Sequence, residues 1–242
     1  MQAQGRQFLK NGVCLALAAL LMRTVSVSFG AYVSEKIGAS GMGLYSLIMS
    51  IYTLAVTFAT SGVQLATTRL VSEALGRGEE GAARAALRLA VRYAVICGTI
   101  AAAVLFFGAP VFGGVILGDG RTVPSLRLLS VALVPIALSS VFSGYFTAVR
   151  RPSRAAGISV LEQAIRILLT VYLLTALLPA GLTYACLALV GGSAIAEILS
   201  ASFLGILYLL DRKKLTKGGD NTLPVRGFLY ITAPIAASSY IR

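Results

Sequence analysis

The sequence predicts an all-α protein, a polytopic membrane bundle of six transmembrane helices and the start of a seventh. Three properties of the composition predict this fold class: 57% of the residues are hydrophobic, only 12% are charged, and the mean hydropathy is +0.84. Soluble globular domains have about 45–50% apolar and about 25% charged residues. The chain therefore has too few polar side chains to cover a water-facing surface, and we expect its helices to lie in a membrane.

Six apolar stretches are long enough to cross a bilayer as helices. A hydrocarbon core of about 30 Å requires about 20 helical residues, each of which rises about 1.5 Å. The stretches are rich in Ala, Leu and Gly, and the prolines within them are tolerated in a helix bundle. The predicted spans are residues 12–33, 44–68, 89–117, 126–149, 158–178 and 183–210.

Two further segments complete the predicted organisation. The glycine-rich segment GASGMGLY, residues 38–45, predicts a tight external turn between the first two spans. The apolar run at residues 227–241 rises only about 22 Å as a helix, too little to cross a bilayer, so it is expected to begin a seventh helix. We therefore expect a six-helix lobe at residues 1–216, and a cytoplasmic linker with the start of helix seven at residues 217–242. The chain is expected to be truncated before a second lobe.

The distribution of basic residues predicts the orientation in the cell membrane. Lys and Arg concentrate at the N-terminus and in every second connection, and the positive-inside rule places these segments in the cytoplasm. The other side has Lys36, Arg121 and Arg127. The cytoplasmic set is Arg6, Lys10, Arg69, Arg77, Arg84, Arg88, Arg92, Arg150, Arg151, Arg154, Arg212, Lys213, Lys214, Lys217 and Arg226.

Four of these arginines form a candidate cytoplasmic basic face: Arg77, Arg84, Arg88 and Arg92. Their spacing of seven and four residues would align them on one side of a continuous helix. Such a face could collect lipid headgroups or phosphates, or it could serve only to anchor the topology. Three glycines between residues 76 and 81 weaken the expectation of a continuous helix.

Arg23 is the most informative polar residue, because it lies near the middle of the first span. Ionisable groups at membrane depth are costly and usually face a cavity or a partner. A planar guanidinium is well suited to phosphate recognition. We interpret Arg23 as a cationic site for an anionic substrate group, and a structural partner for a buried acid is the alternative.

The fifth span has one polar stripe, formed by Ser159, Glu162, Gln163, Arg166 and Thr170. These residues fall within an arc of about 100° on a helix. Glu162 and Arg166 stand in the favourable order for an intrahelical ion pair. The pair could bind substrate or only neutralise itself, and in both cases this face is expected to meet water or protein.

Two other polar residues are candidates for substrate binding. Glu197, near the middle of the sixth span, could be a proton- or cation-coupling carboxylate, or it could be the counter-charge of Arg23. We prefer the counter-charge interpretation, because Glu197 and Arg23 lie at similar depth in the membrane. Gln64 belongs to a row of hydroxyl and amide residues in the second span, which is Ser46, Ser50, Thr53, Thr57, Thr60, Gln64 and Thr67. That row could line a cavity or pack against another helix.

Several functional classes are excluded. The chain has no His, and its cysteines, Cys14, Cys97 and Cys186, are far apart in apolar runs. No catalytic group, metal site or cofactor is therefore expected, and the protein is not expected to be an enzyme. The net charge of +12 does not indicate nucleic-acid binding, because such proteins display their basic residues on a polar, water-facing surface.

Four segments resemble those of the polysaccharide-export flippases. They are LLMR at residues 20–23, the glycine turn that runs into Leu44 and Tyr45, RLVSEALGRG at residues 69–78, and EQAIRI at residues 162–167. The last resembles the stage V sporulation protein B branch. This group is related to the lipid II flippases, within the multidrug/oligosaccharidyl-lipid/polysaccharide exporter superfamily. The resemblance covers only the N-terminal half of such a protein.

The resemblance implies a two-lobed bundle around a central cavity that opens alternately to each side of the membrane. It implies an undecaprenyl-linked oligosaccharide or peptidoglycan precursor as substrate, and Arg23 matches the first-helix arginine of the family. The expected partners are this lipid-linked sugar diphosphate, membrane lipids and a second lobe, in cell-wall, polysaccharide or spore formation. A cation-coupled multidrug antiporter and a non-transporting scaffold of envelope or spore assembly remain alternatives.

Overall fold

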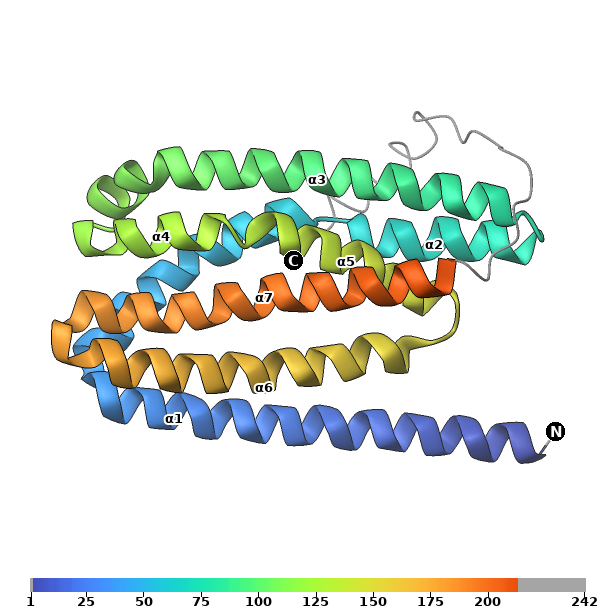
Figure 1. The fold of residues 1–242 in the computed structure, drawn as a ribbon, viewed down its shortest axis with the longest axis horizontal. Helices are drawn as coiled ribbons and strands as arrows, with labels where there is room; N and C mark the ends of the chain where they lie inside the picture. Colours follow the sequence, from blue (N-terminus) through green and yellow to red (C-terminus); the bar gives the residue numbers. More distant parts are fainter. Residues whose placement is uncertain (1, 213–242) are drawn as a thin grey trace.

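The computed structural model describes residues 2–212, with side chains from residue 20 to residue 211 except residue 154. Within this range the chain is helical and has no strand, which confirms the all-α prediction (Figure 1). The segment from residue 217 onward, predicted to begin a seventh helix, lies outside the described residues. The helices are α1 (Gln2–Thr60), α2 (Val63–Gly76), α3 (Glu80–Pro110), the π-helix η1 (Val111–Ile116), the 3-10 helix η2 (Gly120–Thr122), α4 (Val123–Ser130), α5 (Leu133–Ala148), α6 (Pro152–Leu177), the 3-10 helix η3 (Leu178–Ala180) and α7 (Leu182–Arg212).

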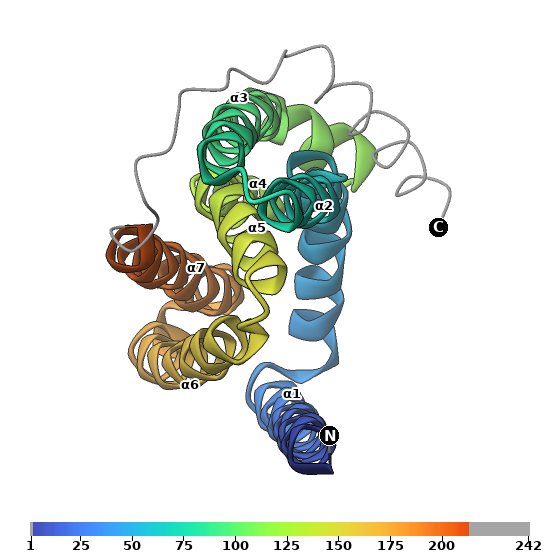
Figure 2. The ribbon, with the colours of Figure 1, turned by 90° about the vertical axis from the view of Figure 1, so that its right-hand side faces the viewer.

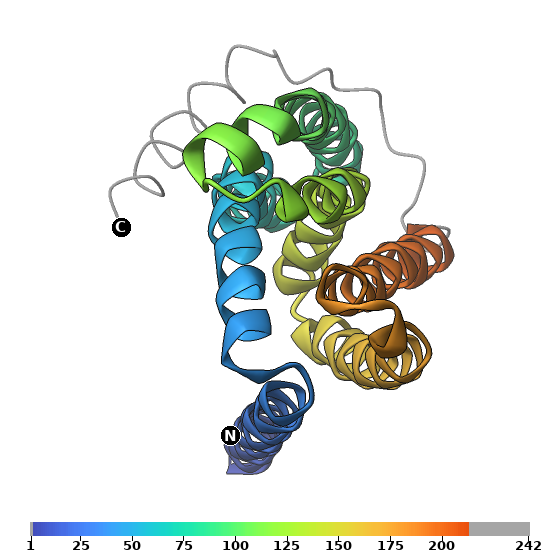
Figure 3. The same ribbon diagram turned by 90° about the vertical axis from the view of Figure 1, so that its left-hand side faces the viewer.

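Helix α1 consists of two arms that meet at Gly38. This residue has φ 70° and ψ 179°, a backbone conformation that only glycine adopts without strain. The first arm runs beside α6, and the second arm crosses the molecule toward α2 (Figures 1 and 3). The predicted turn between the first two spans is therefore present.

The predicted second span, residues 44–68, is interrupted. The second arm of α1 ends at Thr60, and α2 begins at Val63 after Gly62, which has φ 69°. The predicted fourth span, residues 126–149, is also divided, into α4 and α5 at a bend of 44°. Pro135 explains this bend, because a proline at this position cannot donate a hydrogen bond to the carbonyl of Val131.

The described helices are those of a multi-pass membrane protein. Four helical stretches are long and apolar enough to cross a membrane, and a fifth is obtained if α4 and α5, with η2, count as one bent span. The first stretch, Leu20–Gly76, contains the bend at Gly38, so it includes the first two predicted spans. The total of six spans remains a prediction.

Two hydrophobic clusters hold the helices together. The larger one lies among the second arm of α1, the start of α6, and α2, α3, α4, α5 and α7, and its most buried side chains include Leu87, Leu126 and Phe146. The smaller one joins the first arm to α6 and α7 near the bend, through Val33 and Leu174 among others. Beyond this cluster the first arm stands apart from the main group of helices (Figure 2), with Leu20, Leu21 and Val27 exposed.

Candidate functional site

Two adjoining cavities lie between the first arm of α1 and the rest of the bundle. The inner cavity, of about 500 Å³, is lined by both arms of α1 and by α4, α5, α6 and α7. The outer cavity, of about 890 Å³, lies between the first arm and α6. Both are lined by Ser26, Gln163 and Arg166, so these three residues form their common boundary.

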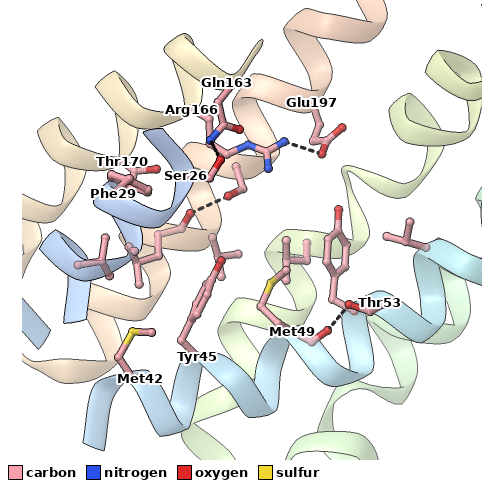
Figure 4. A pocket seen from close by; sticks show the side chains of 18 of the residues that line it. Ser26, Phe29, Met42, Tyr45, Met49, Thr53, Gln163, Arg166, Thr170 and Glu197 are labelled. Atoms are coloured by element: carbon pink, nitrogen blue, oxygen red, sulfur yellow. Dashed lines mark hydrogen bonds and ion pairs between the residues drawn. The ribbon is translucent and has the colours of Figure 1, made fainter. Parts of the chain in front are cut away.

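An ion-pair cluster of Glu162, Arg166 and Glu197 occupies this boundary. The Arg166 guanidinium donates to Glu162, one turn earlier on α6. It also donates, over 3.0 Å, to Oε1 of Glu197 on α7 (Figure 4). The three side chains are 18–29% exposed. Two carboxylates share one guanidinium, so the cluster has a formal charge of −1 when all three groups are ionised.

The preferred interpretation of Glu197 as the counter-charge of Arg23 is wrong. Glu197 binds Arg166 instead, because α6 and α7 form a tightly packed hairpin that brings these residues into contact. Arg23 lies on the first arm, on the other side of the outer cavity.

Arg23 lines the outer cavity, and its side chain is exposed. Among residues 20–211 it forms no hydrogen bond or ion pair, so its alternative interpretation as the partner of a buried acid finds no support there. The outer cavity also receives the hydroxyl of Ser26 and the side chains of Ser159 and Gln163. The same cavity is lined by the Glu162–Arg166 ion pair, so Arg23, which has no partner among residues 20–211, is the group there that can bind an anion.

The polar stripe of α6 faces the two cavities along its whole length. Ser159 and Glu162 line the outer cavity, Thr170 lines the inner cavity, and Gln163 and Arg166 line both. The expectation that this face meets water or protein therefore agrees with the structure. Gln163 also donates a hydrogen bond of 3.1 Å from Nε2 to Oγ of Ser26, which links α6 to the first arm (Figure 4).

A model of the family described as "Polysaccharide biosynthesis protein" matches residues 8–241. The chain belongs to this family. It is 30% identical over 201 residues to stage V sporulation protein B of Bacillus subtilis (strain 168), and this match covers 83% of the chain and 39% of that protein. It is 26% identical over 209 residues to the lipid II flippase MurJ of the same organism, which covers 83% of the chain and 37% of the flippase.

A solved structure has the same fold as this family member. It is the outward-facing conformation of a multidrug resistance MATE family transporter of the MOP superfamily, with a TM-score of 0.68 and 16% sequence identity. The match covers 93% of this chain and 51% of that transporter. The chain thus spans about half or less of each of these proteins. The prediction that it is not an enzyme agrees with these relatives, which include a flippase and a transporter.

Sequence reasoning missed part of the inner cavity of this family member. Tyr45, Met49, Tyr52 and Val56 of the second arm line it. Their spacing of three and four residues was the available signal, but the same spacing is typical of core packing. Only the position of α6 and α7 opposite this face shows that it borders a cavity.

Gln64 was predicted to bind substrate, and it lines neither of the two cavities. It is exposed in the first turn of α2, beyond the break at Gly62, which ends the continuous face of the predicted row. Of that row, Thr53 lines the inner cavity. Most of its hydroxyls donate to carbonyls three or four residues earlier, including those of Ser50, Thr53, Thr57, Thr60 and Thr67.

The predicted basic face is divided in two. Arg84, Arg88 and Arg92 lie on α3, which begins at Glu80, whereas Arg77 lies in the turn after α2 and precedes Gly78, where φ is 74°. The four arginines therefore do not share one continuous helix, because the chain reverses between them.

The described residues contain no group of three or more His, Cys, Asp or Glu side chains that could hold a metal ion. Within the same part of the chain, Cys97 and Cys186 are free thiols. The candidate functional site of this family member consists of the polar groups that line the two cavities.

Proposed function

We propose that this protein is one lobe of a membrane flippase that moves a lipid-linked sugar across the cell membrane. The observation that supports the proposal best is the guanidinium of Arg23, which has no partner among residues 20–211 and lies at an 890 Å³ cavity between the first arm of α1 and α6. Arginine binds phosphate oxygens through two parallel hydrogen bonds, and such charge-assisted bonds are stronger away from water. An undecaprenyl diphosphate meets both requirements, since its tail stays in the lipid while its diphosphate enters the cavity.

The transport step requires no covalent chemistry in this proposal. The first arm bounds the outer cavity and is exposed toward the lipid over much of its length. A headgroup that enters beside Arg23 would reach the opposite side of the membrane when this lobe rocks against a second one. The relative named as a lipid II flippase supports this class of activity.

We expect Arg23→Ala to lower the translocation of lipid-linked sugar at least about tenfold, because one charge-assisted contact contributes about 1.5–3 kcal/mol. The measurement is export of the labelled sugar lipid by the full-length protein in proteoliposomes. Lys36→Ala is the matched control, since Lys36 is an exposed basic residue on the same arm and lines neither cavity. Undiminished export by Arg23→Ala at normal membrane abundance would overturn the proposal.

A cation-coupled multidrug antiporter is the second candidate function. The observation in its favour is the pair of carboxylates, Glu162 and Glu197, at the boundary of the cavities. A drug-efflux assay on the full-length protein separates the two: efflux that depends on Glu197 and is indifferent to Arg23 supports the antiporter. A scaffold role predicts neither activity.

A further inference from the structure

One row of residues runs along the outside of α3, from the α2–α3 turn to the middle of the helix. Helix α3 lies at the edge of the bundle, with α2 and α5 packed against it (Figure 2). Residues spaced four apart form a slanting ridge on a helix. The row is Glu80, Arg84, Arg88, Arg92, Ile96, Ile100 and Val104, and its members from Arg88 onward are exposed. It therefore has a basic end beside the turn and an apolar end at mid-helix.

The basic end of the row has a net formal charge of +2, because it contains three arginines and one glutamate. Arg88 and Arg92 stand one turn apart on the exposed face, which places their Cβ atoms about 5–6 Å from each other. Among the described residues, Arg92 forms no hydrogen bond or ion pair. Two guanidinium groups at this spacing can bind one phosphate group through charge-assisted hydrogen bonds.

The apolar end of the row opens into a slot of about 350 Å³ between α3 and the second arm of α1. Ile100 and Val104 form one wall, Leu54 and Phe58 belong to the other, and Phe112 of η1 completes the lining. Every residue that lines the slot is apolar. The four wall side chains are 48–68% exposed, so the slot is open to the surroundings of the bundle.

The slot is suited to a hydrocarbon chain. Water does not fill such a space, because a buried water needs about two to four polar partners. The position also fits one leaflet of a bilayer. Ile100 and Val104 lie about 12 Å and 18 Å beyond Arg92 along the helix, and half of the hydrocarbon core is about 15 Å thick. A lipid with its headgroup beside Arg92 therefore has chains that reach the slot.

We propose that the row on α3 binds an anionic phospholipid of the leaflet beside the α2–α3 turn. Arg88 and Arg92 bind its phosphate, and one acyl chain lies in the slot. Charge complementarity selects the headgroup, since basic residues at a membrane surface attract anionic lipids. A zwitterionic lipid has a phosphate too, but its own cation cancels the charge that the arginines attract.

This lipid site is separate from the candidate functional site. Leu54 and Phe58 lie on the face of the second arm opposite to Tyr52 and Val56, which line the inner cavity. A chain in the slot therefore packs behind the cavity wall and supports the contact of this arm with α3. The assignment goes beyond the proposed function and does not depend on it.

The test compares phosphatidylglycerol with phosphatidylcholine of identical acyl chains. The purified full-length protein in an uncharged detergent is titrated with each lipid, and bound lipid is counted by native mass spectrometry. We expect the wild type to bind phosphatidylglycerol about tenfold more tightly, and the double variant Arg88→Gln, Arg92→Gln to lose most of this preference. Arg77→Gln, at an exposed arginine of the same turn but outside the row, is the matched control.

A second variant tests the slot separately from the charge. Ile100→Trp fills part of the slot, so it should weaken long-chain phosphatidylglycerol about 3- to 10-fold. It should not change the affinity for short-chain phosphatidylglycerol, whose chains end before the slot. Val95→Trp, at an exposed residue of α3 outside the slot, is the matched control. Melting curves without lipid show whether the variants are folded.

The proposal is overturned if the wild type binds both lipids equally, or if the double arginine variant keeps the full preference. In the latter case the arginines serve only to orient the chain in the membrane. Long-chain binding that is indifferent to Ile100→Trp removes the slot from the site. A lipid-free dimer of the wild type that Ile100→Trp dissociates would show that the slot is a protein interface and contradict the lipid assignment.

The variant that tests the proposed function keeps the two proposals distinguishable. Arg23→Ala should bind phosphatidylglycerol as tightly as the wild type, because Arg23 lies in the outer cavity and not on α3. Equal loss of phosphatidylglycerol in Arg23→Ala would place this lipid in the outer cavity and overturn the site on α3. Normal phosphatidylglycerol binding by a variant that no longer exports sugar lipid supports both proposals.

Discussion

The guanidinium of Arg166 binds two carboxylates from two helices, and all three groups are largely enclosed. Charges at such positions are tolerated only when each has a partner. Removal of the arginine would leave Glu162 and Glu197 facing each other without a counter-charge. Arg166 therefore stabilises the contact between α6 and α7 as well as bordering both cavities.

We expect Arg166→Met to lower the free energy of unfolding by about 3 kcal/mol, the lower end of the range for a broken buried ion pair, because the groups are partly exposed. The measurement is thermal or denaturant unfolding of the purified protein in detergent. The triple variant Arg166→Met, Glu162→Gln, Glu197→Gln should recover most of this loss, since no charge is left unpaired. Equal destabilisation of both variants would contradict the charge argument.

Some of the residues at the two cavities could be predicted from the sequence, and others could not. The stripe of Glu162, Gln163 and Arg166 was predicted from helical spacing alone, and it does face the cavities. The partner of Glu197 was predicted wrongly, because depth in the membrane does not say which helices are neighbours. The hydroxyl of Tyr52 is buried and has no hydrogen-bond partner among the described residues, and the sequence had no signal for this, since any tyrosine in an apolar run looks the same.

At the scale of elements, α6 and α7 pack unusually closely where Gly192 meets Thr170. A Cβ atom added to Gly192 would lie 2.9 Å from the backbone nitrogen of Thr170 and 2.3 Å from its Oγ1. Real Cβ atoms do not approach backbone this closely, so any side chain at position 192 would push the two helices apart. Small residues that permit such contacts are typical of helix pairs in membranes.

Gly192→Ala should therefore destabilise the protein by about 1–3 kcal/mol through overpacking, despite the better helix propensity of alanine. Gly205→Ala in the same helix is the matched control, because its added Cβ would meet Phe142 at an ordinary 3.6 Å. Unfolding of the purified variants measures the difference. A loss of stability in Gly205→Ala as large as in Gly192→Ala would rule out the steric explanation.

The breaks between elements were only partly predictable. Gly38 lies in a cluster of glycines and was predicted as a turn, and the structure places the bend there. Gly62 is a single glycine within an apolar run, so the second span was predicted to continue through it, with Gln64 in one row with the hydroxyls before the break. An isolated glycine is compatible with a helix, and only packing shows whether the chain breaks there.

At the scale of the whole molecule, the connections alternate between two ends. The start of α1, the α2–α3 turn and the α5–α6 link lie at one end of the bundle, and the bend at Gly38, the α3–α4 connection and the α6–α7 turn lie at the other (Figure 1). The first end has Arg77, Arg150 and Arg151, while the second has Lys36 and Arg121. This arrangement is the one that the alternation of basic residues predicted.

The positive-inside rule then predicts which end is cytoplasmic. In a cysteine-free background, Ser153→Cys near the start of α6 should react with a membrane-impermeant maleimide only after permeabilisation. Gly120→Cys in η2 should react in intact cells, because it lies at the opposite end. Labelling in the reverse pattern would place the N-terminus outside and refute the predicted orientation.

The sequence by itself determined that the chain is a membrane helix bundle, where most of its spans lie, and which face of α6 is polar. These properties depend on composition and on helical spacing, which are local. The partner of Arg166, the separation of Arg23 from any acid among the described residues, and the two adjoining cavities were decided only by the tertiary structure. They depend on which helices pack together, and many interhelical contacts are compatible with the same pattern of apolar residues.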